Sequence, residues 1–130
     1  MSKRKPIKVV YLNVSRFEGA SVVEIAPELD EYYRLIECEL IDIVSRKIGK
    51  NYYDIICDDE GLYAPTVRIS AVDNEFQPML VGNLIICKSG RDGYEHGLSE
   101  AEQAEVLEHI TKIRTLACPE GYKMLMDVEY

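Results

Sequence analysis

Residues 80–110 read LVGNLIICKSGRDGYEHGLSEAEQAEVLEHI: an apolar run, then a glycine-rich charged loop, then an acidic segment. The apolar run has the composition of a strand, and Ser99 followed by Glu102 fits a capping box at the start of a helix. A strand that leads through a flexible loop to a helix N-terminus is a common way of holding phosphate groups. The stretch therefore predicts a strand followed by a helix, and it marks the loop between them as a candidate ligand site.

Upstream of this stretch the sequence is rich in strand signals. Six strands are predicted: five upstream, at residues 7–14, 21–26, 38–48, 52–57 and 66–72, and the apolar run itself, at 79–87. The first two are expected to pair across a turn containing Gly19, and the third and fourth to form a hairpin. Gly82 is expected to mark a bulge in the sixth strand, and Gly61 to take a positive φ in the turn DDEG.

Two helices are predicted. The first, Glu28–Leu35, follows Pro27, and the second begins near Ser99. Their expected apolar faces are Leu29, Tyr32, Tyr33 and Ile36 in the first, and Val106, Leu107, Ile110 and Ile113 in the second. Helices and strands do not alternate regularly, which favours an α+β fold: a mostly antiparallel β-sheet with two helices packed on it, in a single compact domain. We expect residues 1–6 to form a flexible basic tail and 7–117 the domain. The remaining segment, 118–130, is expected to be a C-terminal strand or an oligomerisation arm.

The net charge of −8 is unevenly distributed. Four of the 15 basic residues lie at positions 3, 4, 5 and 8, so the rest of the chain carries 23 acidic residues against 11 basic ones. One acidic region spans residues 24–42 and a second spans 95–108. Such a surface repels a phosphate backbone, which argues against direct nucleic-acid binding. It is typical either of a well-solvated surface or of a protein that imitates nucleic acid towards a DNA-binding partner.

Cellular location and metal chemistry are constrained by what the sequence contains. The longest apolar runs are too short to span a bilayer, and the basic N-terminus leads into a strand rather than a secretory signal, so we expect a cytoplasmic protein. The four cysteines, at positions 38, 57, 87 and 118, have no paired spacing, and neither histidine lies near one of them. Free thiols, with no zinc site and no cofactor, are therefore predicted. The acidic residues after Cys57 are expected to raise the pKa of its thiol.

The loop at residues 87–97 is the first candidate site. Its glycines, positive charges and ring could hold an anion beside the helix N-terminus, although a merely mobile connection has the same composition. The nine tyrosines against two phenylalanines suit either a base-stacking pocket or buried and interface positions. The candidate ligand-binding residues are Lys88, Arg91, Tyr94, His96, Arg68, Tyr53, Tyr63 and Arg114.

The turn DDEG is the second candidate site. Asp58, Asp59 and Glu60 could bind magnesium or activate water in a small hydrolase. Adjacent residues on a strand point to opposite sides, however, so three consecutive carboxylates rarely converge. A turn capped by an aspartate side chain is the interpretation that the pattern favours, and no catalytic residue is predicted.

Two motifs carry a resemblance to a known family. YYDIICDDEGLYAPT, and LVGNLIIC with the later GLSEAEQAEVL, are similar to the family catalogued as domain of unknown function 3846, over about residues 32–113. That family is found in phages and other mobile elements, and it has no assigned catalytic residues to transfer.

The resemblance implies a context rather than a reaction. Small acidic phage proteins often antagonise host defence. The resemblance together with the basic loop favours a non-enzymatic homo-oligomeric sponge that sequesters a nucleotide-derived immune signal, of the cyclic oligonucleotide or cyclic ADP-ribose type, in the host cytoplasm. The alternative is an acidic inhibitor or DNA mimic that binds a host defence protein.

Overall fold

The computed structural model describes residues 5–15, 19–61, 69–72, 78–91, 93–113 and 123–127. Its elements in chain order are β1 (Ile7–Asn13), β2 (Gly19–Ile25), α1 (Leu29–Ile36), β3 (Ile41–Ile48), β4 (Asn51–Asp58), β5 (Ile69–Val72), β6 (Pro78–Val81), β7 (Leu84–Ser89), β8 (Glu95–His96), α2 (Glu100–Glu108), β9 (Ile110–Ile113) and β10 (Lys123–Asp127). The predicted α+β class, with a mostly antiparallel sheet and two helices, is confirmed.

The main sheet has the strand order β2-β1-β7-β4-β3, and β8 extends it by pairing with β7. All of its pairings are antiparallel. The two predicted hairpins are present: β1 pairs with β2 from Ile7 opposite Ile25 to Asn13 opposite Gly19, and β3 pairs with β4 around a two-residue turn. Gly19, the first residue of β2, at φ 81°, and Gly49, in the turn between β3 and β4, at φ 66°, adopt positive φ angles that glycine accepts without strain. Both hairpins are thus set by local sequence.

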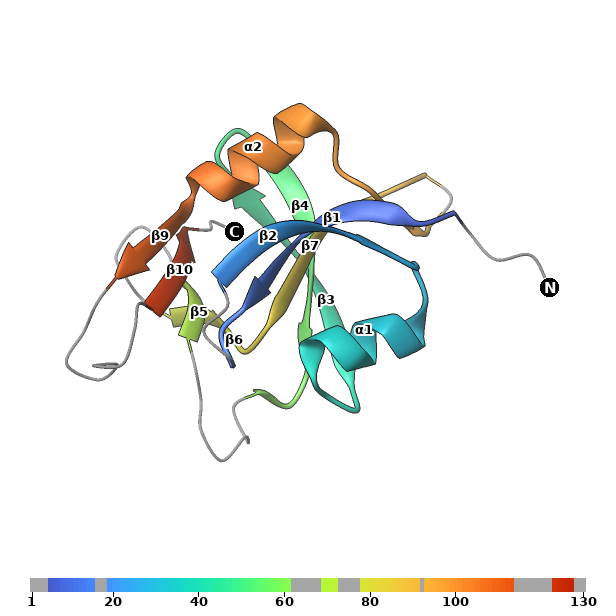
Figure 1. The fold of residues 1–130 in the computed structure, drawn as a ribbon, viewed down its shortest axis with the longest axis horizontal. Coiled ribbons are helices and arrows are strands. Elements are labelled where there is room, and N and C mark those ends of the chain that lie inside the picture. The colour runs from blue at the N-terminus through green and yellow to red at the C-terminus, as the bar shows by residue number, and fades with distance from the viewer. Residues whose placement is uncertain are drawn as a thin grey trace.

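The two helices cover opposite faces of this sheet (Figure 1). On one face, Tyr32 and Ile36 of α1 pack with Ile56 of β4 and Ile85 of β7. On the other face, Val106 of α2 packs among residues of β1, β4 and β7. Each large apolar side chain buried in this way contributes roughly 1.5–3 kcal/mol to stability. The main sheet is therefore sandwiched, and its central strand β7 is apolar on both faces.

A second sheet, ordered β6-β5-β10-β9, packs on the same face as α2, where Ala71 and Leu80 join the core. It corrects the prediction of one strand at 79–87: the chain leaves β6 in the second sheet, turns at Gly82 (φ 78°) and enters β7 in the main sheet. Gly82 is thus the turn between two sheets and not a bulge within one strand.

The end of the second helix also differs from the prediction. We expected Ile110 and Ile113 to extend the apolar face of α2, but the helix ends at Glu108 and β9 begins at Ile110. Isoleucine and threonine at 110, 111 and 113 favour a strand, and β10 supplies an antiparallel partner for it. The pairing with β10 therefore overrides the helical spacing of these residues.

Two single-residue predictions were wrong. Leu29 was expected on the buried face of the first helix, but it is the first helical residue and is 56% exposed. Gly61 was expected to take a positive φ, and it does not. A Cβ at Gly61 would lie 2.7 Å from Cγ2 of Val81, so this glycine is required by close packing against β6.

The C-terminal segment supplies the strand β10, which pairs antiparallel with β9 and parallel with β5 of the same chain. Residues 114–122 and 128–130 lie outside the described part of the chain. A role for residues 118–130 in oligomerisation stays a prediction, as does the domain boundary at residue 117.

Candidate functional site

The candidate loop is the turn of a β-hairpin that joins β7 to β8. The backbone amide of Gly90 donates to the carbonyl of Tyr94 at 2.9 Å, and that of Gly93 donates to the carbonyl of Gly90 at 3.1 Å. Gly93 has φ 81°, which favours glycine. These bonds close the loop on itself, so those two amides are directed at carbonyls of the loop. The loop does not have the open form of a phosphate cradle.

Lys88 is held by groups of the chain itself. Its Nζ lies 3.1 Å from the carbonyl oxygen of Tyr52 and 3.3 Å from Oε2 of Glu102, and it sits 4.7 Å from the ring centroid of Tyr53. The ammonium is thereby paired with a carboxylate and stacked on an aromatic face. A ligand phosphate would have to compete with Glu102 for this cation.

Tyr53 is a core residue. It is 1% exposed, and its hydroxyl donates to Oε1 of Glu105 at 2.6 Å. Burial raises the pKa of the Tyr53 phenol well above its usual value, and the hydrogen bond to Glu105 raises it further. The same bond lowers the pKa of the Glu105 carboxyl, aided by Asn51. Tyr53 therefore ties β4 to α2 and offers no ring face for stacking a base.

The start of α2 is capped from within, as predicted. The amide of Glu102 donates to the Ser99 hydroxyl at 3.2 Å, and the Ser99 amide donates to Oε1 of Glu102 at 2.8 Å. Partial burial would by itself raise the pKa of Glu102, but the bonds from Ser99 and the contact with Lys88 lower it overall. With Glu100 beside it, the helix N-terminus carries carboxylates where an anion would bind.

The other candidate residues are placed differently from one another. His96 is half-buried and lies opposite Lys88 in the β7–β8 ladder. Arg91 and Tyr94 lie in the hairpin turn, both exposed, Tyr94 at 55%. The remaining three candidates, Tyr63, Arg68 and Arg114, lie outside the described residues. Of the five that are described, the structure thus brings together Lys88 and Tyr53, with His96 next to them.

The thiols of the described cysteines have raised pKa values. Burial, reinforced by the neighbouring carboxylates, raises the pKa of Cys57 to about 12 and that of Cys87 to about 12. For Cys38, burial and Asp58 raise the pKa to about 11. The predicted effect of the acidic residues after Cys57 is confirmed, although burial is the larger cause. None of these thiols has the lowered pKa of a nucleophile.

The turn DDEG forms as predicted. Oδ1 of Asp58 accepts the amide of Glu60 at 2.8 Å, an aspartate-capped turn. Within the described ranges, no group of three or more histidine, cysteine, aspartate or glutamate side chains is arranged to hold a metal ion. The carboxylate of Asp58 is therefore engaged by its own backbone.

Sequence reasoning missed how two acidic segments converge. The β3–β4 ladder places Ile41 opposite Asp58, and the amide of Asp59 donates to the carbonyl of Leu40 at 3.0 Å. We call the resulting surface the acid end. It consists of Glu37, Glu39, Asp42, Asp58, Asp59 and Glu60, all exposed except the half-buried Asp58. The predicted hairpin register could have indicated it, because pairing 38–48 with 52–57 brings both runs to one end.

Two large apolar side chains accompany the acid end. Leu40, whose carbonyl accepts the amide of Asp59, is 51% exposed, and Ile43, on the edge strand β3, is 44% exposed. Asp42, Asp58 and Asp59 each lie near enough to Cys57 to raise the pKa of its thiol. The acid end thus combines concentrated negative charge with exposed apolar area.

A family model described as "Domain of unknown function (DUF3846)" matches residues 7–111. The chain belongs to this family. No curated protein and no solved structure matches the chain. The DUF3846 match begins at β1, and so reaches further towards the N-terminus than the motifs at 32–113, and it includes both the β7–β8 hairpin and the acid end.

In the segments that the structure describes, neither helix has the length and apolar character needed to cross a bilayer.

Proposed function

We propose that this protein is a binding protein whose acid end contacts a basic surface of a partner protein. The observation that carries the proposal is that the segment with Glu37, Glu39 and Asp42 lies beside the segment with Asp58, Asp59 and Glu60, next to the exposed Leu40. Exposed apolar area next to charged side chains is a combination that protein interfaces use. Concentrated charge on one surface also accelerates encounter with an oppositely charged partner.

The proposal is for binding without turnover. Asp58 is used by its own turn, and the thiols of Cys38, Cys57 and Cys87 have raised pKa values. These features favour a binding protein over a hydrolase that uses the DDEG turn. In the finer form of the proposal, the protein is encoded by a phage or mobile element, acts in the host cytoplasm and inhibits a host defence protein, as an imitation of DNA would.

The sequestration of a nucleotide-derived signal is the second candidate function. The observation in its favour is that Arg91 and Tyr94 are exposed on one tight turn, where a guanidinium and a ring could hold a phosphate and a base. The helix cap and the Lys88–Glu102 pair weaken this candidate, because they place negative charge beside the turn. A homo-oligomer that combines turns from several copies would supply more positive charge.

The first function is tested with a charge-neutralised acid end. The variant Glu39→Gln/Asp59→Asn/Glu60→Gln removes three exposed carboxylates, and the control Glu28→Gln/Asp30→Asn/Glu108→Gln removes three elsewhere. Binding of a fluorescent lysine-rich peptide is measured by anisotropy at several salt concentrations. We expect the acid-end variant to bind about tenfold more weakly than the control, since exposed charge pairs each contribute up to about 1 kcal/mol. Equal losses in both variants would show that only net charge matters, and would refute the proposal.

The second function is tested by a thermal-shift screen against cyclic dinucleotides, cyclic trinucleotides and cyclic ADP-ribose isomers. A ligand at 100 times its dissociation constant stabilises the fold by about 2.7 kcal/mol, a shift of several degrees for a domain of this size. A shift that disappears in Arg91→Ala, with the ligand recovered intact, would support sequestration. An altered ligand would indicate an enzyme, and no shift across the panel would remove this candidate.

A further inference from the structure

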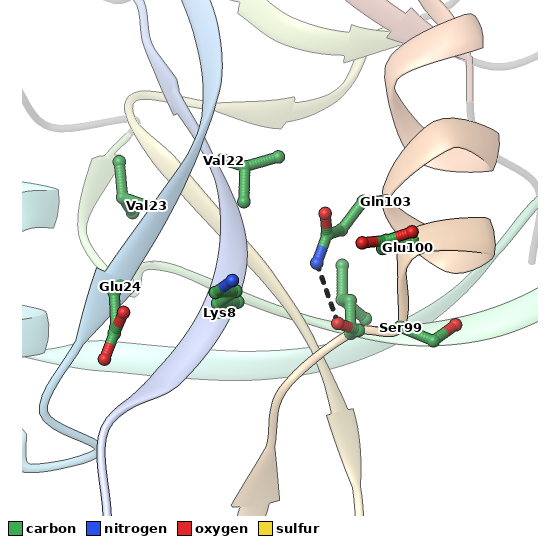
Figure 2. Close-up of a pocket in the computed structure, with 8 residues that line it drawn as sticks. Lys8, Val22, Val23, Glu24, Ser99, Glu100 and Gln103 are labelled. Carbon is green, nitrogen blue, oxygen red and sulfur yellow. Dashed lines mark hydrogen bonds between the residues drawn. The ribbon is translucent and has the colours of Figure 1, made fainter.

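A groove lies between the edge strand β2 and the start of α2 (Figure 2). Its volume is about 520 Å³. Lys8, Val22 and Glu24 line it from the sheet, and Ser99, Glu100 and Gln103 line it from the helix. The amide side chain of Gln103 donates to the carbonyl of Leu98 at 2.9 Å, which fixes the helical wall of the groove.

The sheet wall of the groove is an open edge. β2 is the outermost strand of the main sheet, and within the described part of the chain it pairs with β1 alone. In an antiparallel strand, alternate residues direct their N–H and C=O groups away from the partner. Ser21, Val22 and Glu24 are exposed, and β2 contains no proline to block the addition of another strand. The edge can therefore accept main-chain hydrogen bonds from an extended peptide.

Side chains beside this edge favour one kind of peptide. Val22 lies opposite Val10, and Glu24 opposite Lys8, so both side chains point to the face that α2 covers. Val22, 39% exposed, offers apolar contact in the groove. The exposed carboxylates of Glu24 and Glu100 outnumber the one ammonium, of Lys8, so the groove is acidic overall.

We propose that β2 binds an extended basic peptide segment of a partner protein as an additional strand. Main-chain hydrogen bonds to β2 would hold the peptide, and side chains at alternate positions would enter the groove. An apolar side chain would cover Val22, and a lysine or arginine would lie near Glu24 and Glu100. The groove lies at the β2 edge of the main sheet, and the acid end lies at the opposite edge, on β3 and β4. The two surfaces are tested by different substitutions, so this proposal and the proposed function can fail independently.

The probe is a fluorescein-labelled peptide, Ser-Lys-Thr-Val-Thr-Lys-Ser, which presents lysine and valine on one face of a strand. Its affinity is measured by anisotropy on the full chain. The variant Glu24→Gln/Glu100→Gln is compared with Glu28→Gln/Glu108→Gln, which makes the same change in charge outside the groove. We expect the groove variant to lose about fivefold in affinity relative to the control.

A second probe tests the main-chain bonds separately from charge. The same peptide with alternate backbone nitrogens methylated keeps its side chains but loses hydrogen-bond donors along one edge. Of the two methylation patterns, we expect one to abolish binding and the other to preserve it. In NMR spectra of the protein, the backbone amide chemical shifts that change on binding of the unmethylated peptide should lie mainly in β2. Equal affinity for the unmethylated and both methylated peptides, equal losses in the two protein variants, or no binding up to about 1 mM would each overturn the proposal.

Discussion

Asn83 holds three segments together from the turn before β7. Its Oδ1 accepts the amides of Val14 at 2.9 Å and Ser15 at 3.1 Å, while its Nδ2 donates to the carbonyl of Leu35 at 3.1 Å. Nδ2 also lies 3.1 Å from Oε2 of Glu37. The side chain is 2% exposed, so it replaces water for groups at the end of β1 and the end of α1.

Replacing Asn83 should therefore be costly. We expect Asn83→Ala to lower the free energy of unfolding by about 2–4 kcal/mol, because it leaves buried amides and a carbonyl without partners. Urea denaturation of this variant and of Ser45→Ala, an exposed site, provides the comparison. Similar midpoints for the two variants would show that water satisfies the abandoned groups.

Thiol reactivity should follow the raised pKa values. Because the thiolate is the nucleophile, we expect Cys57 and Cys87 to react with iodoacetamide at pH 7.5 at least about tenfold more slowly than a free cysteine. Cys38, half-buried and with a pKa of about 11, should react the fastest of the three described cysteines. Peptide mass spectrometry over time measures each site, and rapid labelling of Cys87 would contradict this account.

At the scale of the element, the capping box of α2 should contribute to the free energy of unfolding by an amount that depends on pH. Ser99→Ala is expected to lower stability by about 0.5–2 kcal/mol. The pKa of Glu102 is lower in the folded chain than in the unfolded one, so its contribution is complete above the unfolded value of about 4.3. It is lost as the pH falls through the folded pKa.

Glu102→Gln isolates this effect. The difference in unfolding free energy from the wild type should be constant from about pH 5 to pH 7 and should shrink below about pH 4. Glu108→Gln, at the exposed end of the same helix, is the matched control and should show no such trend. A difference that grows on acidification would mean that the sign of the Glu102 shift is wrong.

Elements set by neighbouring residues were predictable from the sequence. Gly19 and the Gly49–Lys50 turn close hairpins between strands adjacent in sequence, and Ser99 with Glu102 fixes a helix start within four residues. Elements set by distant partners were not. The split at Gly82 and the end of α2 at Glu108 depend on which sheet each strand joins, and on β10.

The candidate site follows the same division. The sequence correctly indicated Arg91 and Tyr94 as residues of one turn, because loop membership is local. It could not show that Lys88 pairs with Glu102 or that Tyr53 is buried under α2, since both depend on how the helix lies across the sheet. Predicting the acid end would have required one further inference: that the predicted pairing of the third and fourth strands brings two acidic segments together.

At the scale of the whole molecule, the acid end should oppose folding. Its six carboxylates lie together in a chain of net charge −8, and like charges destabilise the compact state. We expect Glu39→Gln/Asp59→Asn/Glu60→Gln to raise the midpoint of thermal unfolding by a few degrees at low salt. The difference should vanish near about 1 M salt, where the screening length is about 3 Å.

Scanning calorimetry at a series of salt concentrations measures this effect. Glu28→Gln/Asp30→Asn/Glu108→Gln, with equal net charge, should raise the midpoint less, because Glu28 and Asp30 lie at the N-terminus of α1, where negative charge is stabilising, and Glu108 lies on α2. Identical salt dependence of the two variants would locate the repulsion in the overall charge and not in the acid end.

The position of β7 between β1 and β4 determines when the main sheet can close. Synthesis of strands β1 to β4 is complete when the ribosome has added Asp58. The strand β7, which joins the two hairpins, is complete only about 30 residues later, at Ser89. At roughly 5–20 residues per second, the ribosome leaves both hairpins with open inner edges for a few seconds. A nascent chain paused in this interval would expose the unpaired edges of β1 and β4, which could pair with other chains. Selection on codon speed and on chaperone contact would therefore act most strongly on the segment between Asp58 and Ser89.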